Sequence, residues 1–309
     1  MMKELKQFDV VVVGELNPDL ILSGDVQPVF GQVEKIVNQS TLTIGSSSAI
    51  FACGAARLGL WVAFVGKVGG DLFGEYIRNS LDEYGIDTSG IVVDKLTPTG
   101  VSVILSTGND RAILTYPGTI PHLSYSDINQ ELIKNARHLH VGSYFIQDSL
   151  RSDMPFLFER AHEWGLSVSL DTNFDPTGKW DGGLDKLLRS VDVFLPNAVE
   201  CQGIARDANL EHALDKIQSK VKYLGVKLGE KGAILYQGSK KYSCKAINVT
   251  VVDTVGAGDS FDAGFIYGYL AGWEPEQILK LANICGGLST RQAGGTAAQP
   301  TLDEALCYL

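Results

Sequence analysis

Short apolar runs that alternate with helical patterns constrain the fold of this chain more than any other feature of its sequence. The runs read "FDVVVVG", "VAFVGKVG", "HLHVGSYF", "LSVSLD", "DVFLPN", "YLGVKLG" and "GAILY", and stretches such as "DMPFLFERAHEWG" have helical spacing between them. Continuous apolar runs predict strands that are buried on both faces. Because strands separated by helices are joined by right-handed crossovers, we expect an α/β fold: a doubly wound, mainly parallel sheet with helices on both faces.

Two segments, at about 20–43 and 99–118, interrupt this alternation. Neither has a helical period, and the second alternates apolar and polar residues around "TGND", a hairpin turn signal. If the segments pair with each other, they form a small β lid over the carboxyl edge of the main sheet; two ordinary surface hairpins are the alternative. No repeat or linker divides the chain, so we expect a single domain over residues 1–309 that carries this lid.

Charge and cysteine usage exclude several classes of protein. The formal net charge is −10, which argues against a broad basic face for nucleic acid and leaves room for a small anionic ligand. The five cysteines are far apart and include no C-x-x-C pair, so neither a disulfide framework nor a zinc site is indicated. No stretch approaches the ~20 apolar residues of a membrane span. We expect a cytoplasmic protein without nucleic-acid or membrane partners.

The stretch "DTVGAGDSFDAGF", residues 253–265, follows the apolar run "INVTVV" and predicts a strand-to-helix turn. Such glycine turns at helix N-termini bind anions through unpaired N–H groups and the helix dipole, yet this one carries a carboxylate, Asp259. It lacks the lysine of the Walker pattern and the third glycine of G-x-G-x-x-G. From the residues alone, Asp259 could simply be a helix N-cap.

Over its whole length, this stretch resembles the C-terminal signature of the ribokinase-like carbohydrate kinases, also called the phosphofructokinase B family. The resemblance implies that Gly256, Ala257 and Gly258 form an anion hole for the phosphoryl group in transit. It also implies that Asp259 is the general base for the acceptor hydroxyl, which would explain a carboxylate beside an anion site.

Other motifs extend the resemblance into the nucleotide half. "LPNAVE" matches the family's N-x-x-E, which makes Asn197 a cofactor-binding residue and Glu200 a ligand of Mg²⁺; a plain helix cap is the alternative. "VKLGEKGAIL" resembles the segment that runs along the ATP phosphates. It contains Gly229 and Gly232, and it places Lys227 where many relatives have Thr; a solvated lysine at a strand end is the alternative.

Two asparagines and one carboxylate are weaker candidates from the same resemblance. Asn173 in "LDTNFD" is expected at the nucleotide site, and Asn283 in "LANICGG" is expected at the adenine pocket, although a polar residue partway along a helix is often just exposed. Relatives often bind a monovalent cation such as K⁺ beside the glycine turn. In this chain Asp253 and the Val255 carbonyl would be its contacts.

The substrate half both follows the family and departs from it. "GELNPDLIL" resembles the opening strand with its sugar-binding Asn-x-Asp, so Asn17 and Asp19 are expected to bind hydroxyls, although "NPD" also suits a turn. Most relatives carry a Gly-Gly pair followed by an Ala-Asn step. Here Gly45 is kept, Ser46 replaces the second glycine and Ile50 replaces the asparagine, so neither ribose nor fructose can be carried over as the substrate.

Together these motifs predict an ATP-dependent kinase that phosphorylates a hydroxyl of a sugar or polyol. A nucleoside kinase of the same fold is one alternative, and a noncatalytic nucleotide or sugar sensor is another. The lid sheet could pair with a second copy, because open strand edges invite pairing. His138 and His140 form an H-x-H on one face of a predicted strand; we interpret them as a strand-end pair rather than a metal site.

Overall fold

The computed structural model describes residues 6–107 and 110–309. Within them, nine strands form one large sheet in the order β13-β12-β11-β10-β9-β8-β1-β4-β5. All neighbours from β11 to β5 are parallel, and β12 and β13 add an antiparallel hairpin at one end. The strands are β1 (Phe8–Val13), β4 (Val62–Gly69), β5 (Asp87–Asp94), β8 (Ala136–Val141), β9 (Ser167–Leu170), β10 (Val193–Phe194), β11 (Tyr223–Lys227), β12 (Ala233–Gln237) and β13 (Lys240–Cys244). The predicted mainly parallel sheet is confirmed.

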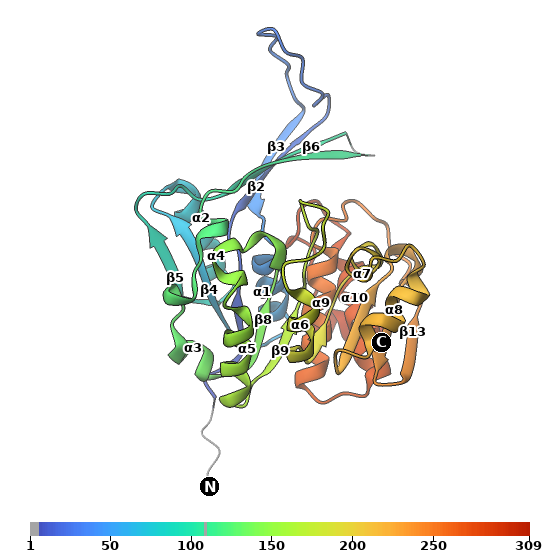
Figure 1. Cartoon of the computed structure of the whole chain (residues 1–309). Coiled ribbons are helices and arrows are strands. Elements are labelled where there is room, and N and C mark those ends of the chain that lie inside the picture. The colour runs from blue at the N-terminus through green and yellow to red at the C-terminus, as the bar shows by residue number, and fades with distance from the viewer. Residues whose placement is uncertain (1–5, 108–109) are drawn as a thin grey trace.

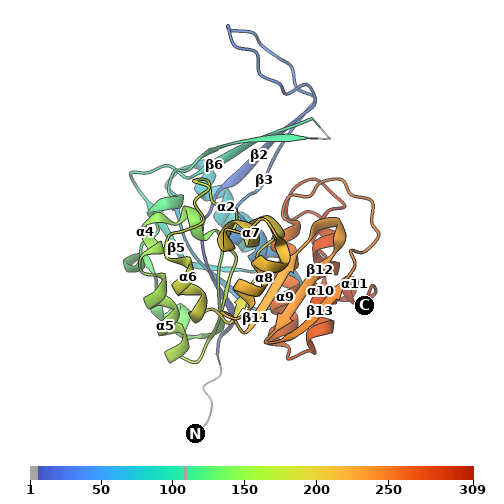
Figure 2. The ribbon, with the colours of Figure 1, turned by 45° about the vertical axis from the view of Figure 1, so that its right-hand side comes forward.

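Helices cover both faces of this sheet (Figures 1 and 2). One face packs against α1 (Ser47–Arg57), α2 (Leu72–Glu83), α9 (Ala257–Leu270), α10 (Pro275–Ser289) and α11 (Leu302–Leu306). The other packs against α3 (Gln130–Lys134), α4 (Asp148–Arg151), α5 (Met154–Glu163), α6 (Leu184–Leu187), α7 (Ala198–Ala205) and α8 (Leu210–Gln218). Short 3₁₀ segments lie at Ile120–His122, Tyr125–Asp127, Tyr144–Ile146, Leu188–Ser190 and Gly229–Lys231.

The continuous valine run of β1 explains why both faces are covered. Side chains of a strand alternate between its two faces, so Val10 and Val12 enter the core beside α1 and α9, whereas Val11 and Val13 enter the core beside α5. All four valines are fully buried, and each contributes roughly 1.5–3 kcal/mol of hydrophobic stabilisation. Among the helices of the described residues, none combines the length and the apolar character that a membrane span requires.

The second, smaller sheet has the strand order β3-β2-β6-β7 and stands above the large sheet (Figures 1 and 2). Its strands are β2 (Pro18–Ser23), β3 (Gln39–Ile44), β6 (Val101–Ser106) and β7 (Arg111–Tyr116). The parallel pairing of β2 with β6 joins the two segments that interrupt the alternation, so they are not separate hairpins. Residues 108–109 of the "TGND" turn lie outside the described residues.

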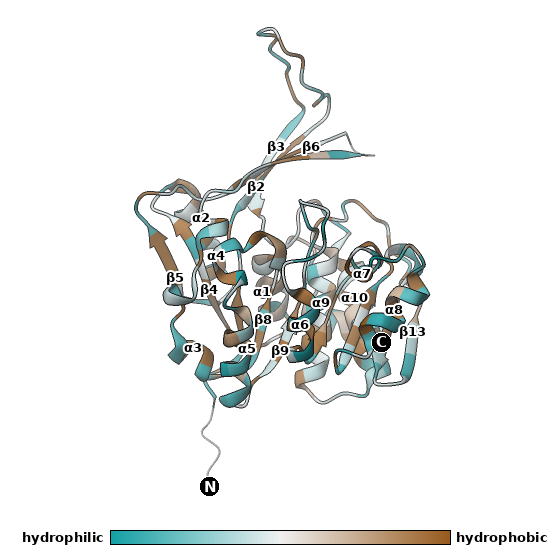
Figure 3. Cartoon of the chain, viewed as in Figure 1, coloured by the Kyte–Doolittle hydropathy of each residue, from teal (hydrophilic) through white to brown (hydrophobic). Residues whose placement is uncertain are grey.

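Apolar side chains are exposed on this second sheet. The connection between β2 and β3 projects away from the rest of the chain and is partly brown, that is hydrophobic, in Figure 3; Phe30 and Ile36 within it are exposed. Every residue of the outer strand β7 is exposed, Ile113 and Leu114 included. Within residues 6–107 and 110–309, no strand pairs with the outer edge of β7, and that strand carries exposed apolar side chains.

The H-x-H pair lies at the centre of the large sheet, on β8, and not at a strand end. His138 and His140 are fully buried, and the Ser169 hydroxyl on β9 lies between them, 2.7 Å from His138 Nε2 and 2.8 Å from His140 Nδ1. The Ser167 hydroxyl is 2.7 Å from His138 Nδ1. Serines on the adjacent strand therefore satisfy these ring nitrogens.

Acid should destabilise the protein through these two histidines. Burial lowers the pKa of His138 to about 3, and burial with the neighbouring His138 lowers the pKa of His140 to about 3, from 6.5. Between about pH 6.5 and pH 3 these two histidines are protonated in the unfolded chain but neutral in the native state. The free energy of unfolding therefore decreases as the pH is lowered through this range. At pH 5 each of the two histidines lowers the free energy of unfolding by about 2 kcal/mol.

The measurement is urea unfolding at pH 7 and pH 5. In His138→Gln, the loss of unfolding free energy between these pH values should be about 2 kcal/mol smaller than in the parent chain. His212→Gln, at an exposed position of α8, serves as the control. An unchanged pH dependence in His138→Gln would contradict the buried neutral state.

Candidate active site

The carboxyl ends of β1, β8, β9, β10 and β11 meet beneath the second sheet, which is where open α/β sheets bind ligands. There lies a cavity of about 530 Å³, here called the lid-side cavity. Residues after these strands, the second sheet and the turn before α9 all contribute to it. Its lining includes Glu15, Asn17, Asp19, Ser47, Arg111, Ser143, Asp171, Asn173, Asn197, Glu200, Lys227 and Asp259.

A second cavity of about 610 Å³ opens on the other side of the glycine turn, between the β11–β12 turn, residues 246–251 and α10. We call it the helix-side cavity. Its lining includes Gly232, Ile247, Phe261, Asn283 and Gly287. Four residues, Lys227, Gly229, Thr254 and Gly258, line both cavities. The two cavities therefore meet at the turn that the sequence singled out.

The geometry of this turn requires its first glycine. Gly256 has φ +72° and precedes α9, and a Cβ there would lie 2.6 Å from Gly295 Cα and 2.9 Å from Ile50 Cγ2. Ala257 and Gly258 begin the helix, whose first N–H groups have no partner within it. A backbone cradle with the positive end of the helix dipole thus lies between the cavities.

Asp259 follows the cradle directly and lines the lid-side cavity. One carboxylate oxygen each from Asp259, Asp171 and Asp262 lie within 4.8 Å of one another. Burial, together with Asp171 and Glu15, raises the pKa of Asp259 well above its ordinary value, while Lys227 and a hydrogen bond from Ser47 oppose the rise. Its carboxylate is therefore a stronger base than a solvated aspartate.

Lys227 is the cation of this acidic cluster. Its Nζ lies 2.8 Å from Asp171 Oδ2 and 3.1 Å from both oxygens of Asp262, and its side chain is only 13% exposed. Burial alone would lower the pKa of Lys227, but Asp171, Asp262 and Glu200 outweigh burial and hold the pKa above its ordinary value. The alternative of a solvated lysine at a strand end is therefore wrong.

Asn197 and Glu200 form a capping box at the start of α7. Asn197 N donates to Glu200 Oε2 at 2.8 Å, and Asn197 Nδ2 donates to Glu200 Oε1 at 2.6 Å. Burial and the nearby Asp171 raise the pKa of Glu200 to about 7, against the effect of Lys227. The cap and the cavity lining are thus the same two residues, so the two interpretations of this motif are compatible.

Asn17 and Asp19 are buried at the base of β2 and face the lid-side cavity. Asn17 Nδ2 lies 3.2 Å from Asp19 Oδ1 and 3.3 Å from Ser102 Oγ. Burial raises the pKa of Asp19 to about 7. A Cβ on Gly45 would lie 2.1 Å from Asp19 Oδ1, so only glycine at position 45 leaves this pair in place.

The residues that depart from the family pattern take defined structural roles. Ser46 keeps a positive φ of +69°, as a glycine would, and its hydroxyl caps α1 at Ala49 N and donates to Glu15 O at 2.5 Å. The methyl carbons of Ile50 pack against Gly256 and Gly295. An apolar contact therefore supports the glycine turn at position 50, where the resemblance led us to expect an asparagine.

The nucleotide candidates separate between the two cavities. Gly232 and Asn283 line the helix-side cavity, and Asn283 Nδ2 donates to Lys245 O at 2.9 Å. Gly232 has φ +91°, and a Cβ there would lie 2.0 Å from Cys244 O. Asn173 and Asn197 line the lid-side cavity and not the helix-side cavity, and their roles in nucleotide binding stay predictions.

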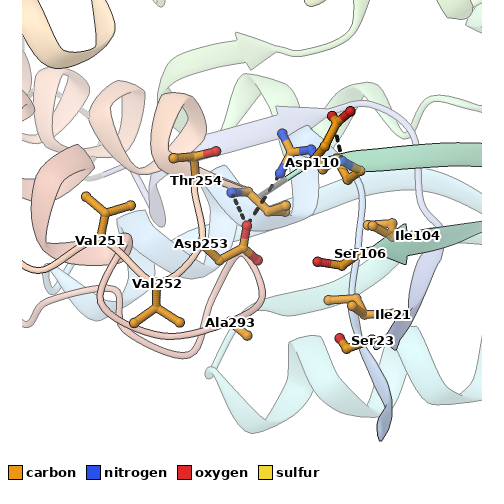
Figure 4. A pocket seen from close by; sticks show the side chains of 12 residues that line it. Ile21, Ser23, Ile104, Ser106, Asp110, Val251, Val252, Asp253, Thr254 and Ala293 are labelled. Atoms are coloured by element: carbon orange, nitrogen blue, oxygen red, sulfur yellow. Dashed lines mark hydrogen bonds and ion pairs between the residues drawn. The ribbon is translucent and has the colours of Figure 1, made fainter. Parts of the chain in front are cut away.

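The second sheet contacts the main body through Asp253, at the edge of a third cavity, of about 530 Å³ (Figure 4). Asp253 accepts hydrogen bonds from Val255 N and Gly294 N, both at 3.0 Å, and Arg111 Nη1 from β7 lies 3.4 Å from its Oδ1. These bonds hold the carboxylate beside the glycine turn. Cation binding by Asp253 and Val255 stays a prediction.

Several residues of the site were not expected from the sequence: Glu15, Ser47, Arg111, Ser143, Asp171 and Asp262. Asp171 and Asp262 lie inside the motifs quoted for Asn173 and Asp259, and Glu15 lies inside the motif of Asn17. Their proximity to those residues was the signal that could have found them. Arg111 and Ser143 had no comparable signal.

A doubly wound sheet, two cavities that meet at a helix N-terminus and an acid at their junction suit the transfer of a phosphoryl group to an alcohol. The profile described as "pfkB family carbohydrate kinase" matches residues 7–302, and the chain belongs to this family. The resemblance inferred from the sequence is thereby confirmed. The chain is therefore an ATP-dependent kinase that phosphorylates a hydroxyl group of a sugar or sugar-like small molecule.

Individual relatives are similar over nearly the whole chain. The ATP-dependent ribose-1-phosphate kinase of Halopiger xanaduensis is 30% identical, over 97% of both chains. The 5-dehydro-2-deoxygluconokinase of Geobacillus thermodenitrificans is 28% identical, over 97% of this chain and 93% of that protein. The solved structure of Arabidopsis thaliana ribokinase complexed with ribose and ATP is 25% identical, with a TM-score of 0.83 over 97% of this chain and 98% of that chain.

Proposed function

We propose that a sugar or related polyol binds in the lid-side cavity, that ATP binds in the helix-side cavity, and that the γ-phosphoryl group crosses between them at Gly256–Gly258. The observation that carries this proposal is the junction: the cavities share Lys227 and Gly258, and Asp259 lies beside them on the lid side. The ribokinase relative solved with ribose and ATP is consistent with two such sites in one chain.

In the proposed reaction, Asp259 accepts the proton of the acceptor hydroxyl. The hydroxyl oxygen bonds to the γ-phosphorus in line as the bond to the bridging oxygen breaks, and ADP leaves. N–H groups of the turn stabilise charge on the transferring oxygens, a contribution of about 3–4 kcal/mol for each well-placed donor. Asn17 and Asp19 orient the acceptor, and the second sheet acts as a lid that excludes water and so limits ATP hydrolysis.

The Glu200 carboxylate suits a hard cation such as Mg²⁺, which neutralises charge on the β- and γ-phosphates when bound. Both Glu200 oxygens already accept hydrogen bonds from Asn197. We therefore propose that this pair holds the ion through water. For a monovalent cation such as K⁺, we propose Asp253 and the Val255 carbonyl. The guanidinium of Arg111 already lies beside that carboxylate.

We further propose that two copies pair through the lid sheets, because β7 is an exposed edge strand with apolar side chains. A cytoplasmic location is proposed from the five cysteines, which are all free thiols in the structure.

A coupled ADP-release assay tests the proposed function. The panel contains sugars, sugar acids and nucleosides, each with and without Mg²⁺ and K⁺. We expect a sugar or sugar acid to stimulate ADP release, and only when Mg²⁺ is present. Stimulation by a nucleoside alone would indicate a nucleoside kinase. Tight ATP binding with no response to any acceptor would instead indicate a noncatalytic sensor and contradict the proposal.

A further inference from the structure

Asn173, Ser47 and Ser143 line the lid-side cavity together with Asp259, and the hydrogen bonds among the first three are not used in the reaction described above. Asn173 Nδ2 lies 2.7 Å from Ser47 Oγ and 3.2 Å from Ser143 Oγ. The Ser47 hydroxyl and the Asp259 carboxylate line the same cavity, and the hydroxyl lowers the pKa of Asp259, so it lies within reach of that carboxylate. The chain positions of these residues, 47, 173 and 259, are far apart, so only the fold brings them together.

The orientation of the Asn173 amide is determined by its other contacts. Its Oδ1 accepts from Phe174 N at 2.9 Å, and its backbone N donates to Asp171 Oδ1 at 2.8 Å. The acceptor end of the amide is therefore occupied, which identifies the group facing Ser47 as the donor NH₂. Asn173 has φ +52°, a left-handed conformation that asparagine tolerates better than most residues.

The Ser47 hydroxyl has a single hydrogen, and the hydrogen bond from Asn173 determines the direction in which that hydrogen points. Because Ser47 Oγ accepts from Asn173, its own hydrogen remains available for Asp259. Ser47 is the first residue of α1, and its neighbour Ser48 anchors that helix end through bonds from its N (3.2 Å) and its Oγ (2.5 Å) to the Glu15 carboxylate. The donor is thus held in place on a helix.

We propose that Asn173 and Ser47 form a relay that positions Asp259, with Asn173 donating to Ser47 and Ser47 donating to one carboxylate oxygen, so that the other oxygen faces the acceptor hydroxyl. Both are positioning residues, not catalytic residues. The inference rests on the proposed role of Asp259 as the base. It assigns Asn173 to the acceptor side of the site.

The charges around Asp259 explain why such a donor matters. Asp171 on the loop after β9, Glu15 after β1, Asp262 on α9 and Glu200 on α7 are all acidic, and Lys227 of β11 already pairs with Asp171 and Asp262. The Ser47 hydroxyl stabilises the charged form of Asp259 without adding charge. Its removal raises the pKa of Asp259 further, so the acid limb of the rate profile should move to higher pH.

Ser47→Ala tests the relay directly. We expect kcat to fall about 10- to 100-fold, the range for a hydrogen bond to a charged group, with the KM for ATP unchanged and the acid limb of kcat at higher pH. Ser47→Thr retains a hydroxyl and should recover most of the rate. Alanine suits the first turn of a helix, and thermal melting checks the fold. Ser219→Ala, at an exposed site after α8, is the matched control.

A double-mutant cycle with Asn173→Gly tests whether the two residues act together. Glycine tolerates the left-handed backbone. We expect Asn173→Gly to lower kcat and to shift the acid limb in the same direction, and the double variant to be no slower than Ser47→Ala. Multiplying effects, or a parental kcat and pH profile in Ser47→Ala while Asp259→Asn is inactive, would overturn the relay alone. An active Asp259→Asn would overturn the proposed base, and the relay with it.

Discussion

Asp259→Asn is expected to fold and to bind ATP but to phosphorylate its acceptor about 10²–10⁴-fold more slowly, the contribution of a positioned general base. The amide keeps the size of the side chain and its place at the cavity junction, but it cannot accept the hydroxyl proton. The measurement is kcat with the acceptor found in the ADP-release assay, together with the affinity for ATP in a direct binding titration.

Stability separates this result from misfolding. The pKa of Asp259 is raised in the native state, mainly by burial and by Asp171. A carboxyl group with a raised native pKa destabilises the fold at pH values above its ordinary pKa, so the neutral amide should leave stability at pH 7 equal or higher. Asp303→Asn, at an exposed position of α11, controls for the loss of one carboxylate. A parental rate in Asp259→Asn would show that another group is the base.

The sequence predicted the layers of the fold because each layer is encoded locally. The valine run of β1 predicts burial on both faces, and the structure divides it between two cores. The segments at 20–43 and 99–118 lacked a helical period, and they supply β2, β3, β6 and β7. The order and direction of the strands in the sheet could not be predicted. The run "GAILY" has the same apolar pattern as the other buried runs, but it forms β12, which is antiparallel to β11.

The site was predictable only where a motif is continuous in the chain. Gly256 and Asp259 lie in one stretch, and the structure places them at one cavity junction. Asn173 was expected at the nucleotide site from the resemblance of "LDTNFD" alone, and that motif carries no information about which cavity the residue will face. Its contact with Ser47 joins the loop after β9 to the first residue of α1, so it depends on how these elements are arranged in the fold and not on any local pattern.

Lys227 shows the same limit. The sequence placed it near the phosphates, but its pairing with Asp171 and Asp262 depends on β9, β11 and α9 meeting in space.

The pairing of Lys227 with these two carboxylates leads to the second large expected effect. Lys227→Met keeps the length of the side chain and removes its charge, leaving acidic neighbours buried without a cation. Breaking a buried pair in this way typically costs about 3–5 kcal/mol.

Urea unfolding at pH 7 and pH 5 measures this cost. With the ammonium gone, the pKa values of the neighbouring carboxyl groups rise, and protonation at pH 5 then relieves their repulsion. The deficit of Lys227→Met relative to the parent should therefore be larger at pH 7 than at pH 5. The control is Lys216→Met, which removes an exposed ion pair with Asp207 and should cost no more than about 1 kcal/mol.

A second substitution distinguishes lost charge from lost packing. Adding Asp262→Asn to Lys227→Met removes one of the unpaired carboxylates, so it should restore part of the stability at pH 7; a packing defect would not be restored. Equal deficits at both pH values with no recovery in the double variant would contradict the role of Lys227 as the counter-charge. Because Lys227 also lines both cavities, the double variant should remain a poor kinase even where its stability recovers, since the ammonium group at the junction of the cavities is then missing.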